Sequence, residues 1–364
     1  MTTTGDRSMD KVLVGMSGGV DSAVAALLLK RAGYEVAGVT LRTWQADEGY
    51  ESRCCDIDDA RSIASQIGID YFPVNCSLDF QKYVVEPFKK EYMQGRTPNP
   101  CVVCNRYLKW DKLMYYAKVI GAQYIATGHY ASIVRLDNGR YTVKKAKHSE
   151  KDQAYMLYKL SQEQLAATLM PLGDLSKDEV RQIAKDAGLS VASKPDSQEI
   201  CFVTDGSYAE YIEKTASQDE VKAGYFVDVE GNILGKHKGI IHYTVGQRKG
   251  LGIALGYPAY VKEIRAESNE VVISDDSSLY GRELLCKDLN FMSIPGLLEG
   301  DSIDCSVKIR YHHDGTKALI ERTDDDTVKV TFEEAVRAAT PGQSAVFYDD
   351  EGLVIGGGII SKVL

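Results

Sequence analysis

The sequence SGGVDS at residues 17–22 follows a short apolar run, KVLVGM at residues 11–16, and leads into a second apolar run at residues 23–30. This order predicts a strand, a tight glycine loop and a helix. Adjacent glycines let backbone N–H groups approach a phosphate closely, and the helix N-terminus adds the positive end of its dipole. A Mg²⁺ ion that bridges Asp21 to a nucleotide would explain a carboxylate beside phosphates. The alternative is an ordinary glycine turn before a capped helix.

The loop resembles the pyrophosphatase loop (PP-loop) of ATP-dependent adenylating enzymes. It lacks the Gly-Lys-Ser/Thr ending of the P-loop, which supplies a lysine of its own. A pyrophosphatase loop serves attack at the α-phosphate of ATP, which leaves an AMP ester and releases pyrophosphate. The resemblance therefore implies adenylating chemistry.

The chain has 364 residues, of which 44% are hydrophobic and 26% charged, so it can form two or three ordinary domains. No run approaches the ~20 apolar residues of a membrane span. Residues 1–9 lack an apolar signal core and are interpreted as a disordered leader, and we expect a cytoplasmic location. The eight cysteines are too sparse for a secreted disulfide scaffold, so a Cys-x-x-Cys pair favours redox, metal-binding or catalytic chemistry.

The net charge of −9 argues against a nucleic-acid partner, but the charge is segregated along the chain. Residues 231–262 contain no Asp or Glu and carry Lys236, His237, Lys238, His242, Arg248, Lys249 and Lys262. Residues 94–118 combine basic residues with Tyr107, Trp110, Tyr115 and Tyr116. Basic and aromatic side chains together suit phosphate contact and base stacking. For the second stretch, a solvated helix face is an equal alternative.

The first 130 residues alternate between strand and helix signals. The expected strands are residues 11–16, 35–41, 71–75 and 124–127, and the expected helices are residues 21–32, 56–68, 78–94 and 105–120. Such alternation predicts a parallel sheet wrapped by helices, with ligands at the carboxyl ends of the strands. A hairpin is expected at residues 132–145, followed by helices near residues 162–169 and 177–187. We therefore predict an α/β domain at residues 10–207, a small β-rich central domain at 208–280 and a C-terminal β-barrel at 281–364.

Three cysteines and a histidine are the other candidate site residues. Cys101 and Cys104 belong to TPNPCVVCN at residues 97–105, and the dipole of the second expected helix favours the Cys104 thiolate. Cys201 lies almost 100 residues further along the chain, so a meeting with Cys104 must be tertiary. A buried apolar cysteine is the alternative for Cys201. His129 follows an expected strand and is either a site residue or a satisfied core histidine.

Eight motifs occur in one order along nearly the whole chain: SGGVDS, GRTPNPxxxCN, ATGHYA, KDQ, the Cys201 segment, HYTVGQRKGLGI, RYHH and TPGQSAVFY. In this combination the chain resembles the bacterial tRNA 2-thiouridylases, which thiolate C2 of the wobble uridine. The resemblance implies an N-terminal adenylating domain, a central domain and a C-terminal β-barrel that together bind a tRNA anticodon arm. It also implies a persulfide donor or sulfur-relay protein as a partner.

The resemblance further implies the role of each site residue. ATP, with Mg²⁺, is expected at Gly15, Met16, Ser17, Gly18, Gly19, Val20, Asp21, Ser22, Leu41 and Gly128. The target base and the tRNA are expected at Asn99, Pro100, Cys101, His129, Lys151, Asp152, Gln153, Arg310, Tyr311 and Gln343. The sulfur is handled by Cys104 and Cys201: a persulfide on Cys201 either attacks C2 directly or is reduced by Cys104, which releases hydrosulfide and leaves a Cys104–Cys201 disulfide.

Cys101 departs from the more usual pattern of this family, which has Asp at its position. A thiol, with a reference pKa near ~8.5, does not simply replace a carboxyl group whose reference pKa is near ~3.9. Cys101, Cys104 and Cys201 instead suit three-point ligation of a [4Fe–4S] cluster, whose fourth iron would hold hydrosulfide. The cluster and the persulfide route remain equal alternatives.

Two other functions also fit part of the sequence. The loop alone is compatible with another PP-loop ligase or amidotransferase that adenylates its substrate and then adds ammonia. The cysteine pair and the C-terminal motifs argue against this. A non-enzymatic RNA-binding or metal-storage module would leave the ATP loop unexplained.

Overall fold

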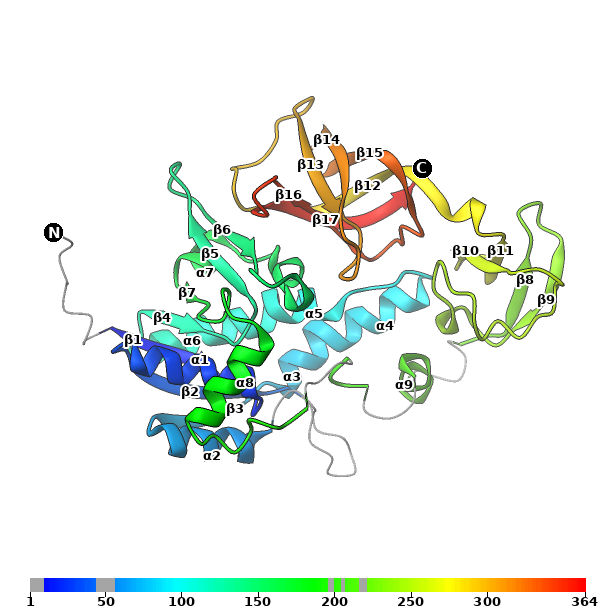
Figure 1. The fold of residues 1–364 in the computed structure, drawn as a ribbon. Helices are drawn as coiled ribbons and strands as arrows, with labels where there is room; N and C mark the ends of the chain where they lie inside the picture. Colours follow the sequence, from blue (N-terminus) through cyan, green and yellow to red (C-terminus); the bar gives the residue numbers. More distant parts are fainter. Residues whose placement is uncertain (1–9, 44–55, 196–199, 204–206, 216–220) are drawn as a thin grey trace. The chain divides into compact units, whose positions relative to one another are not determined.

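The computed structural model describes residues 10–43, 56–195, 200–203, 207–215 and 221–364 (Figure 1). The expected leader at residues 1–9 lies outside the described residues. The chain divides into two compact units. The first unit comprises Met1–Val84, Cys101–Thr204 and Gly352–Val354, and the second comprises Val85–Pro100, Asp205–Glu351 and Ile355–Leu364.

The first unit is built on a parallel sheet. Within the described part of the chain its strand order is β3-β2-β1-β4-β7. The strands are β1 (Lys11–Gly15), β2 (Glu35–Arg42), β3 (Asp70–Asn75), β4 (Tyr124–Ala126) and β7 (Thr168–Leu169). The inner positions of β1 and β2 are buried, and only their end residues are more accessible, because helices cover both faces of a central parallel strand. The predicted α/β sheet is confirmed, and β7 is an addition at the end of a segment predicted to be helical.

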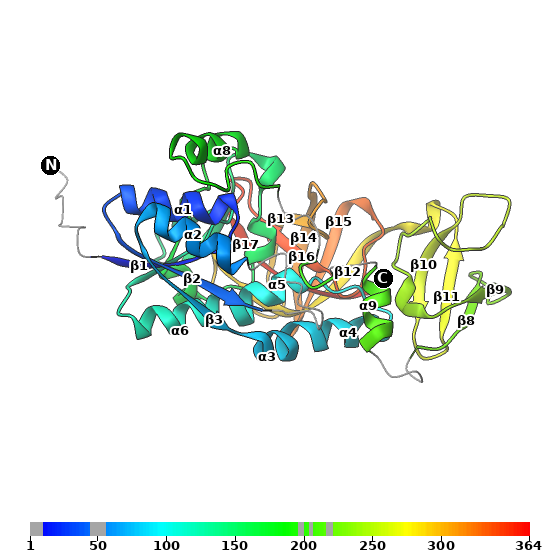
Figure 2. The same cartoon turned by 90° about the horizontal axis from the view of Figure 1, so that it is seen from below.

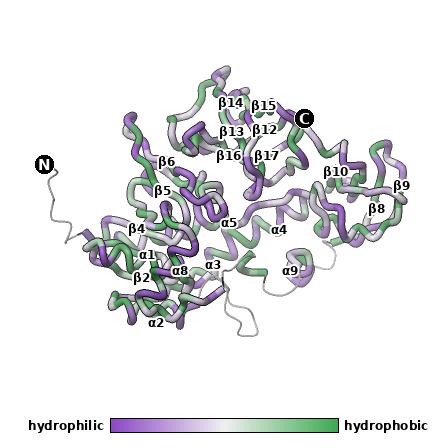
Figure 3. Tube along the Cα trace, in the orientation of Figure 1, coloured by the Kyte–Doolittle hydropathy of each residue, from purple (hydrophilic) through white to green (hydrophobic). Residues whose placement is uncertain are grey.

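Helices cover both faces of this sheet (Figure 2). α1 (Val20–Arg31) and α2 (Ile57–Ile67) lie on one face, and α6 (Asp111–Val119) lies on the other. α8 (Lys177–Asp186) packs against α1 and is largely hydrophilic, as its purple colour in Figure 3 shows. The apolar side chains of β1, α1 and α2 form the main core of this unit.

The helix ends follow the local sequence. The side chain of Asp56 accepts a hydrogen bond from the N–H of Asp59 at the start of α2, and Gly68 ends that helix in the left-handed conformation. α8 begins with a capping box in which Ser176 and Glu179 each bond the other's backbone N–H. These capped ends lie close to the helix limits expected from the sequence.

Two helical runs contain a π-helical segment. In the first run, α3 (Ser77–Phe80) and α4 (Glu86–Met93) flank the π-helix Gln81–Val85. In the second, α5 (Pro100–Cys104) and α6 flank the π-helix Asn105–Trp110. The second run begins five residues before the expected start because proline is favoured at a first helical position. Cys101 therefore lies in the first helical turn, whereas Cys104 comes at the end of α5.

The remainder of the first unit follows β4. The expected hairpin is formed by β5 (Ala131–Arg135) and β6 (Tyr141–Lys145), which pair antiparallel. Short 3₁₀ turns at Ser149–Lys151 and Ala154–Leu157 lead to α7 (Gln162–Ala166). α7 begins with a second capping box, formed by Ser161 and Gln164.

The second unit contains α9 (Tyr208–Thr215), a small sheet and a barrel. The small sheet has the order β10-β11-β8-β9, with β8 (Gly224–Val227), β9 (Ile233–His237), β10 (Tyr260–Arg265) and β11 (Glu270–Ser274). Its core includes Phe226, Val261 and Val271, all fully buried. The predicted small β-rich central domain is confirmed.

The C-terminal strands close into a barrel in the order β12-β15-β14-β13-β16-β17. They are β12 (Tyr280–Phe291), β13 (Ser302–Lys308), β14 (Thr316–Asp324), β15 (Thr327–Arg337), β16 (Ser344–Tyr348) and β17 (Val354–Val363). Closure removes the unpaired strand edges that an open sheet would expose. The predicted C-terminal β-barrel is confirmed. In the described parts of the chain, no helix is both long and apolar enough to cross a membrane.

Candidate nucleotide and sulfur-transfer site

The loop at residues 17–22 joins β1 to α1, as predicted. The backbone N–H of Ser17 donates to the Ser22 hydroxyl at 3.1 Å, and that hydroxyl donates to the carbonyl oxygen of Gly19 at 3.2 Å. Gly18 has a φ of 76°, and a Cβ at this position would lie 2.6 Å from the carbonyl oxygen of Asp56. Only glycine therefore fits between the loop and the start of α2.

Gly128 brings the end of β4 against the same loop. A Cβ on Gly128 would lie 2.6 Å from the backbone nitrogen of Ser22, so a larger residue would push the segment away from the first turn of α1. Leu41 lies near the carboxyl end of β2. The structure thus places the loop, Leu41 and Gly128 at the same edge of the sheet, where ligands of α/β sheets bind.

Asp21, in the first turn of α1, is held by two side chains from distant segments. The ammonium group of Lys177 donates to both carboxylate oxygens, at 2.7 and 2.9 Å, and the Tyr130 hydroxyl donates to one of them at 2.7 Å. The Lys177 side chain is only 13% exposed. Both carboxylate oxygens of Asp21 therefore accept hydrogen bonds from side chains of the same unit.

A second lysine contacts the other end of the loop. Lys194 donates to the carboxylates of Asp56, at 2.8 Å, and Asp59, and its ammonium group lies 3.3 Å from the carbonyl oxygen of Gly18. Burial acts to lower the pKa of Lys194, but its hydrogen bonds to Asp56 and Asp59 raise the pKa overall. The lysine therefore stays charged beside the loop.

His129 follows Gly128 and has an aromatic ring, a hydroxyl group and a lysine among its neighbours. Its ring packs against Trp110 with centroids 5.4 Å apart, and its Nδ1 is 2.9 Å from the Thr127 hydroxyl. Burial, and then the nearby Lys109, lower the pKa of His129 to about 3, so the ring is neutral at pH 7. The ring contact with Trp110 is typical of a core histidine, whereas the position directly after Gly128 is typical of a site residue. Its role as a site residue stays a prediction.

The KDQ motif at residues 151–153 is tied to the backbone around it. The carboxylate of Asp152, which is 7% exposed, accepts hydrogen bonds from the N–H groups of Ala146 and Ala154. The Gln153 side chain accepts one from the N–H of Tyr130 at 3.0 Å. The side chains of Asp152 and Gln153 therefore hold the backbone of neighbouring segments in place. Contact of this motif with RNA stays a prediction.

The candidate cysteines differ in burial. Cys101 is exposed, Cys104 is buried and Cys201 is half-buried, and all three belong to the first unit. Within the described ranges, no group of three or more His, Cys, Asp or Glu side chains could hold a metal ion. As placed, the three cysteines therefore do not form the ligand set of a cluster. In the barrel, burial raises the pKa of Cys305 to about 12 and that of Cys286 further, which keeps both as thiols.

The remaining expected RNA contacts lie in the second unit. Gln343 donates to the carbonyl oxygen of Thr97 at 2.8 Å, so the barrel holds the segment that leads to Asn99 and Pro100. Arg310 donates to the carbonyl oxygen of Arg337 at 3.0 Å, and the Tyr311 ring packs against His312. The exposed cations Lys236, Lys238, Arg248 and Lys249 belong to the same unit.

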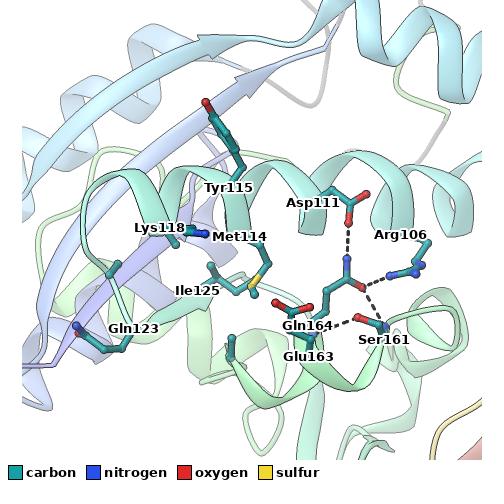
Figure 4. A pocket seen from close by; sticks show the side chains of 13 residues that line it. Arg106, Asp111, Met114, Tyr115, Lys118, Gln123, Ile125, Ser161, Glu163 and Gln164 are labelled. Carbon is teal, nitrogen blue, oxygen red and sulfur yellow. Dashed lines mark hydrogen bonds between the residues drawn. The ribbon is translucent and has the colours of Figure 1, made fainter.

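A separate cavity of about 690 Å³ opens beside α6 and α7 (Figure 4). At its wall Gln164 accepts a hydrogen bond from Arg106 and donates one to Asp111, each at 2.6 Å. None of the residues at 15–22 lines it. The aromatic residues of the basic stretch at residues 94–118 differ in exposure: Trp110 is fully buried, whereas Tyr107 and Tyr115 are 42% and 60% exposed.

Family models match three successive parts of the chain. A tRNA methyl transferase HUP domain matches residues 10–205, a tRNA methyl transferase PRC-barrel domain residues 210–275, and an aminomethyltransferase beta-barrel domain residues 281–360. A tRNA-specific 2-thiouridylase MnmA from Lachnoclostridium phytofermentans is 52% identical over 97% of this chain and 100% of its own length. Its counterpart from Acetivibrio thermocellus is 53% identical over 97% and 99%. The chain belongs to the tRNA-specific 2-thiouridylase family.

Among solved structures, the chain is similar to the U34-tRNA thiolase NcsA from Methanococcus maripaludis with its [4Fe-4S] cluster. The identity is 21%, the match covers 60% of this chain and 71% of that one, and the TM-score is 0.35.

Three residues beside the loop of this 2-thiouridylase family member were not predicted from the sequence: Tyr130, Lys177 and Lys194. The loop sequence SGGVDS contains no Lys or Arg. That absence was the one sequence signal that a cation from another segment would have to face the phosphates. The sequence predicted a helix near residues 177–187 but assigned no role to its lysines. Lys177 lies 156 residues from Asp21 along the chain, so only the tertiary fold joins them.

Proposed function

We propose that this chain performs the reaction for which its relatives are named, the transfer of sulfur to C2 of the wobble uridine of tRNA after activation by ATP. The observation that carries the proposal is the glycine loop at the carboxyl edge of the sheet, in the same compact unit as Cys104 and Cys201. An activating site and two candidate sulfur carriers in one unit suit a reaction that first activates a carbonyl and then replaces its oxygen.

Activation begins at the loop. The carbonyl oxygen of uracil is a poor leaving group, so O2 attacks the α-phosphate of ATP, forms an AMP ester and releases pyrophosphate. The N-terminus of α1 and the N–H groups of the two loop glycines would face the phosphates. We assign to Lys177 and Asp21 the positioning of this turn, and to Leu41 and Gly128 the walls of the nucleotide site.

Sulfur transfer follows on the same unit. A persulfide on Cys201 provides the terminal sulfur that bonds to C2 as AMP leaves, and Cys104 provides the thiolate that breaks the sulfur–sulfur bond. In either route Cys104 attacks the inner sulfur on Cys201 and expels the terminal sulfur, as thiouridine or as hydrosulfide, so the step leaves a Cys104–Cys201 disulfide that a thiol must reduce before the next turnover. A persulfide donor or a sulfur-relay protein would load Cys201.

The proposed steps need no metal ion held by the protein itself. The Asp21 oxygens that Mg²⁺ would need are held by Lys177, so Mg²⁺ is expected to arrive with ATP rather than on a prepared protein ligand. The placement of Cys101, Cys104 and Cys201 does not fit a [4Fe–4S] cluster as it stands. The persulfide route is therefore our preferred proposal, and the cluster remains the alternative to be tested.

The tRNA would engage both units. We propose phosphate contacts at the exposed cations of the second unit and contact with the anticodon arm through Asn99, Pro100, Arg310, Tyr311 and Gln343. In the first unit, Cys101, His129 and Lys151 remain the candidates near the target base. Because tRNA is the substrate, we place the enzyme in the cytoplasm.

The direct test is nucleoside analysis of tRNA after incubation with the full-length protein, ATP, Mg²⁺ and a persulfide donor. We expect 2-thiouridine at the wobble position, with AMP and pyrophosphate formed in equal amounts. A parallel reaction with ammonia in place of sulfur tests the amidotransferase alternative. Pyrophosphate release that depends on ammonia and yields no thionucleoside would contradict the proposal.

A further inference from the structure

Gln153 pairs both backbone polar groups of Tyr130. Its side-chain oxygen accepts a hydrogen bond from the N–H of Tyr130 at 3.0 Å, and its own N–H donates to the carbonyl oxygen of Tyr130 at 2.9 Å. Tyr130 is only 3% exposed, and buried backbone groups need such partners. Gln153 lies 23 residues further along the chain, so these two bonds fix the course of the segment that follows β4.

Gln153 is itself held in place on both sides. Its carbonyl oxygen accepts a hydrogen bond from the N–H of Met156 at 3.0 Å, at the start of a 3₁₀ turn. The buried carboxylate of the preceding residue, Asp152, accepts hydrogen bonds from the N–H groups of Ala146 and Ala154, at 2.9 and 3.2 Å. A residue held in this way gives the tyrosine a fixed support.

Tyr130 in turn contacts both members of the ion pair beside the nucleotide loop. Its hydroxyl donates to a carboxylate oxygen of Asp21 at 2.7 Å, and its ring centroid lies 5.9 Å from the ammonium group of Lys177. Lys177 donates to both oxygens of the same carboxylate. A tyrosine side chain turns about only two torsions, so a shift of its backbone moves the hydroxyl away from Asp21 and weakens that hydrogen bond.

We propose that Gln153 is a positioning residue for the activation of the substrate by ATP. It acts through Tyr130 on the Asp21–Lys177 pair. The inference rests on the proposed function, because it takes ATP as the ligand of the loop. The loop sequence contains no cation, so the phosphates depend on a lysine that the fold keeps in place. This role differs from the RNA contact that the family resemblance implies for Gln153.

The test compares nucleotide binding, tRNA binding and turnover in the full-length protein. Nucleotide binding is measured by titration with α,β-methylene-ATP without tRNA, because this analogue cannot be cleaved between the α and β phosphorus atoms. tRNA binding is measured without nucleotide, and turnover is followed as tRNA-dependent AMP formation from ATP. An RNA contact and a positioning role predict opposite results, since each changes a different one of the two binding constants.

Gln153→Met keeps about the length of the side chain but removes the accepting oxygen. We expect it to bind the analogue about tenfold more weakly and to lower the kcat of AMP formation about tenfold, while its affinity for tRNA stays within about twofold of wild type. Gln153→Glu keeps an accepting oxygen and should restore both quantities to within about threefold of wild type. Gln182→Met, at an exposed glutamine of α8, is the matched control and should behave as the wild type does.

A double variant shows whether Gln153 acts through the tyrosine hydroxyl. Tyr130→Phe removes that hydroxyl and keeps the ring beside Lys177. Adding Gln153→Met to Tyr130→Phe should weaken analogue binding by less than about twofold more, whereas independent residues would give the product of the two single effects. Urea midpoints check that each variant is folded. Gln153→Asn, whose shorter side chain withdraws the oxygen, replaces a methionine variant that does not fold.

Three results would overturn the inference. They are wild-type analogue binding by folded Gln153→Met, a loss of tRNA binding without a loss of analogue binding, and single effects that multiply in the double variant. Failure of the wild-type protein to bind the analogue would instead contradict the proposed function. Absence of 2-thiouridine in the presence of a persulfide donor, with the expected binding results intact, would also contradict only the proposed function.

Discussion

Lys177 donates hydrogen bonds to both carboxylate oxygens of Asp21, at 2.7 and 2.9 Å. The pair joins the first turn of α1 to the first residue of α8, and the Tyr130 hydroxyl completes the set of donors to the carboxylate. A carboxylate held in this way positions a cation at the nucleotide loop, whose own sequence contains none. We propose that Asp21 positions this lysine rather than binding a metal ion itself.

We therefore expect Asp21→Ala and Lys177→Met each to lower tRNA-dependent AMP formation about 100-fold, which is typical when a positioning contact is lost near a reacting group. The exposed Lys185→Met is the control and should retain wild-type rates. A titration of Mg²⁺ decides the role of the carboxylate. If Asp21→Ala alone is rescued by high Mg²⁺ concentration, then Asp21 binds the metal directly and our interpretation is wrong.

Cys104→Ser and Cys201→Ser should each abolish thiolation yet leave AMP formation within about threefold of wild type, because only sulfur transfer needs a thiolate. The assay follows 2-thiouridine and AMP in the same reaction. Cys305→Ser, in the barrel, is the matched control. Full activity of Cys201→Ser with a persulfide donor would make Cys201 a packing residue.

Neutralising Lys236, Lys238, Arg248 and Lys249 together should weaken tRNA binding and reduce its dependence on salt. All four side chains are exposed in the described part of the second unit. Each lost phosphate contact should reduce the slope of log affinity against log salt by about 0.7 to 0.9. Lys214→Gln, on α9, controls for a general loss of charge. An unchanged slope would show that this surface does not contact phosphate.

The cluster alternative makes a distinct prediction for Cys101. If a [4Fe–4S] cluster is ligated, protein purified without oxygen should contain about four iron and four sulfide per chain, and Cys101→Ser should lose both iron and activity. From the placement of the cysteines we expect the opposite: full-rate thiolation by chelator-treated, iron-free protein with a persulfide donor. Loss of activity that tracks loss of iron would contradict that expectation.

His129 should make the protein sensitive to mild acid. Its pKa is about 3 in the folded protein, below the ~6.5 of an unfolded histidine, so the unfolded chain binds more protons between these values. The free energy of unfolding should therefore fall as the pH drops from about 6.5 toward 4, and it should be unaffected by this group above pH 7. Urea midpoints of the wild type and His129→Gln across this range test the effect, because the variant should show a shallower decline. Parallel curves would exclude the histidine as the cause.

The arrangement of the fold was predictable where local signals are strong. β1, the glycine loop and α1 follow from an apolar run, adjacent glycines and a second apolar run, and Asp56 and Ser176 mark helix starts by capping. β7 is only two residues long and belongs to a segment whose periodicity resembles a helix. A strand of that length is defined by its pairing with β4 and has no pattern of its own.

The side chains that complete the site were less predictable. Lys177 and Lys194 lie in polar segments, where lysine usually indicates a solvated surface, and their partners are more than 100 residues away. Gly128 was predicted at the edge of the sheet, but its close approach to Ser22 depends on backbone packing that a sequence pattern does not contain. Charge pairing across the fold, rather than local propensity, decides these positions.

The π-helical segment Asn105–Trp110 follows Cys104 directly in the same helical run, and the last residue of the segment is fixed in the core. Trp110 is fully buried and its indole nitrogen donates to Thr168 at 2.8 Å, so the run is anchored on that side. A π-helical turn holds one residue more than an α-helical turn, and each residue turns an α-helix by about 100°. Shortening this stretch by one residue would therefore rotate the sulfur of Cys104 around the helix axis by more than a quarter of a turn. The direction in which that thiol faces depends on the number of residues in the stretch, independently of their chemistry.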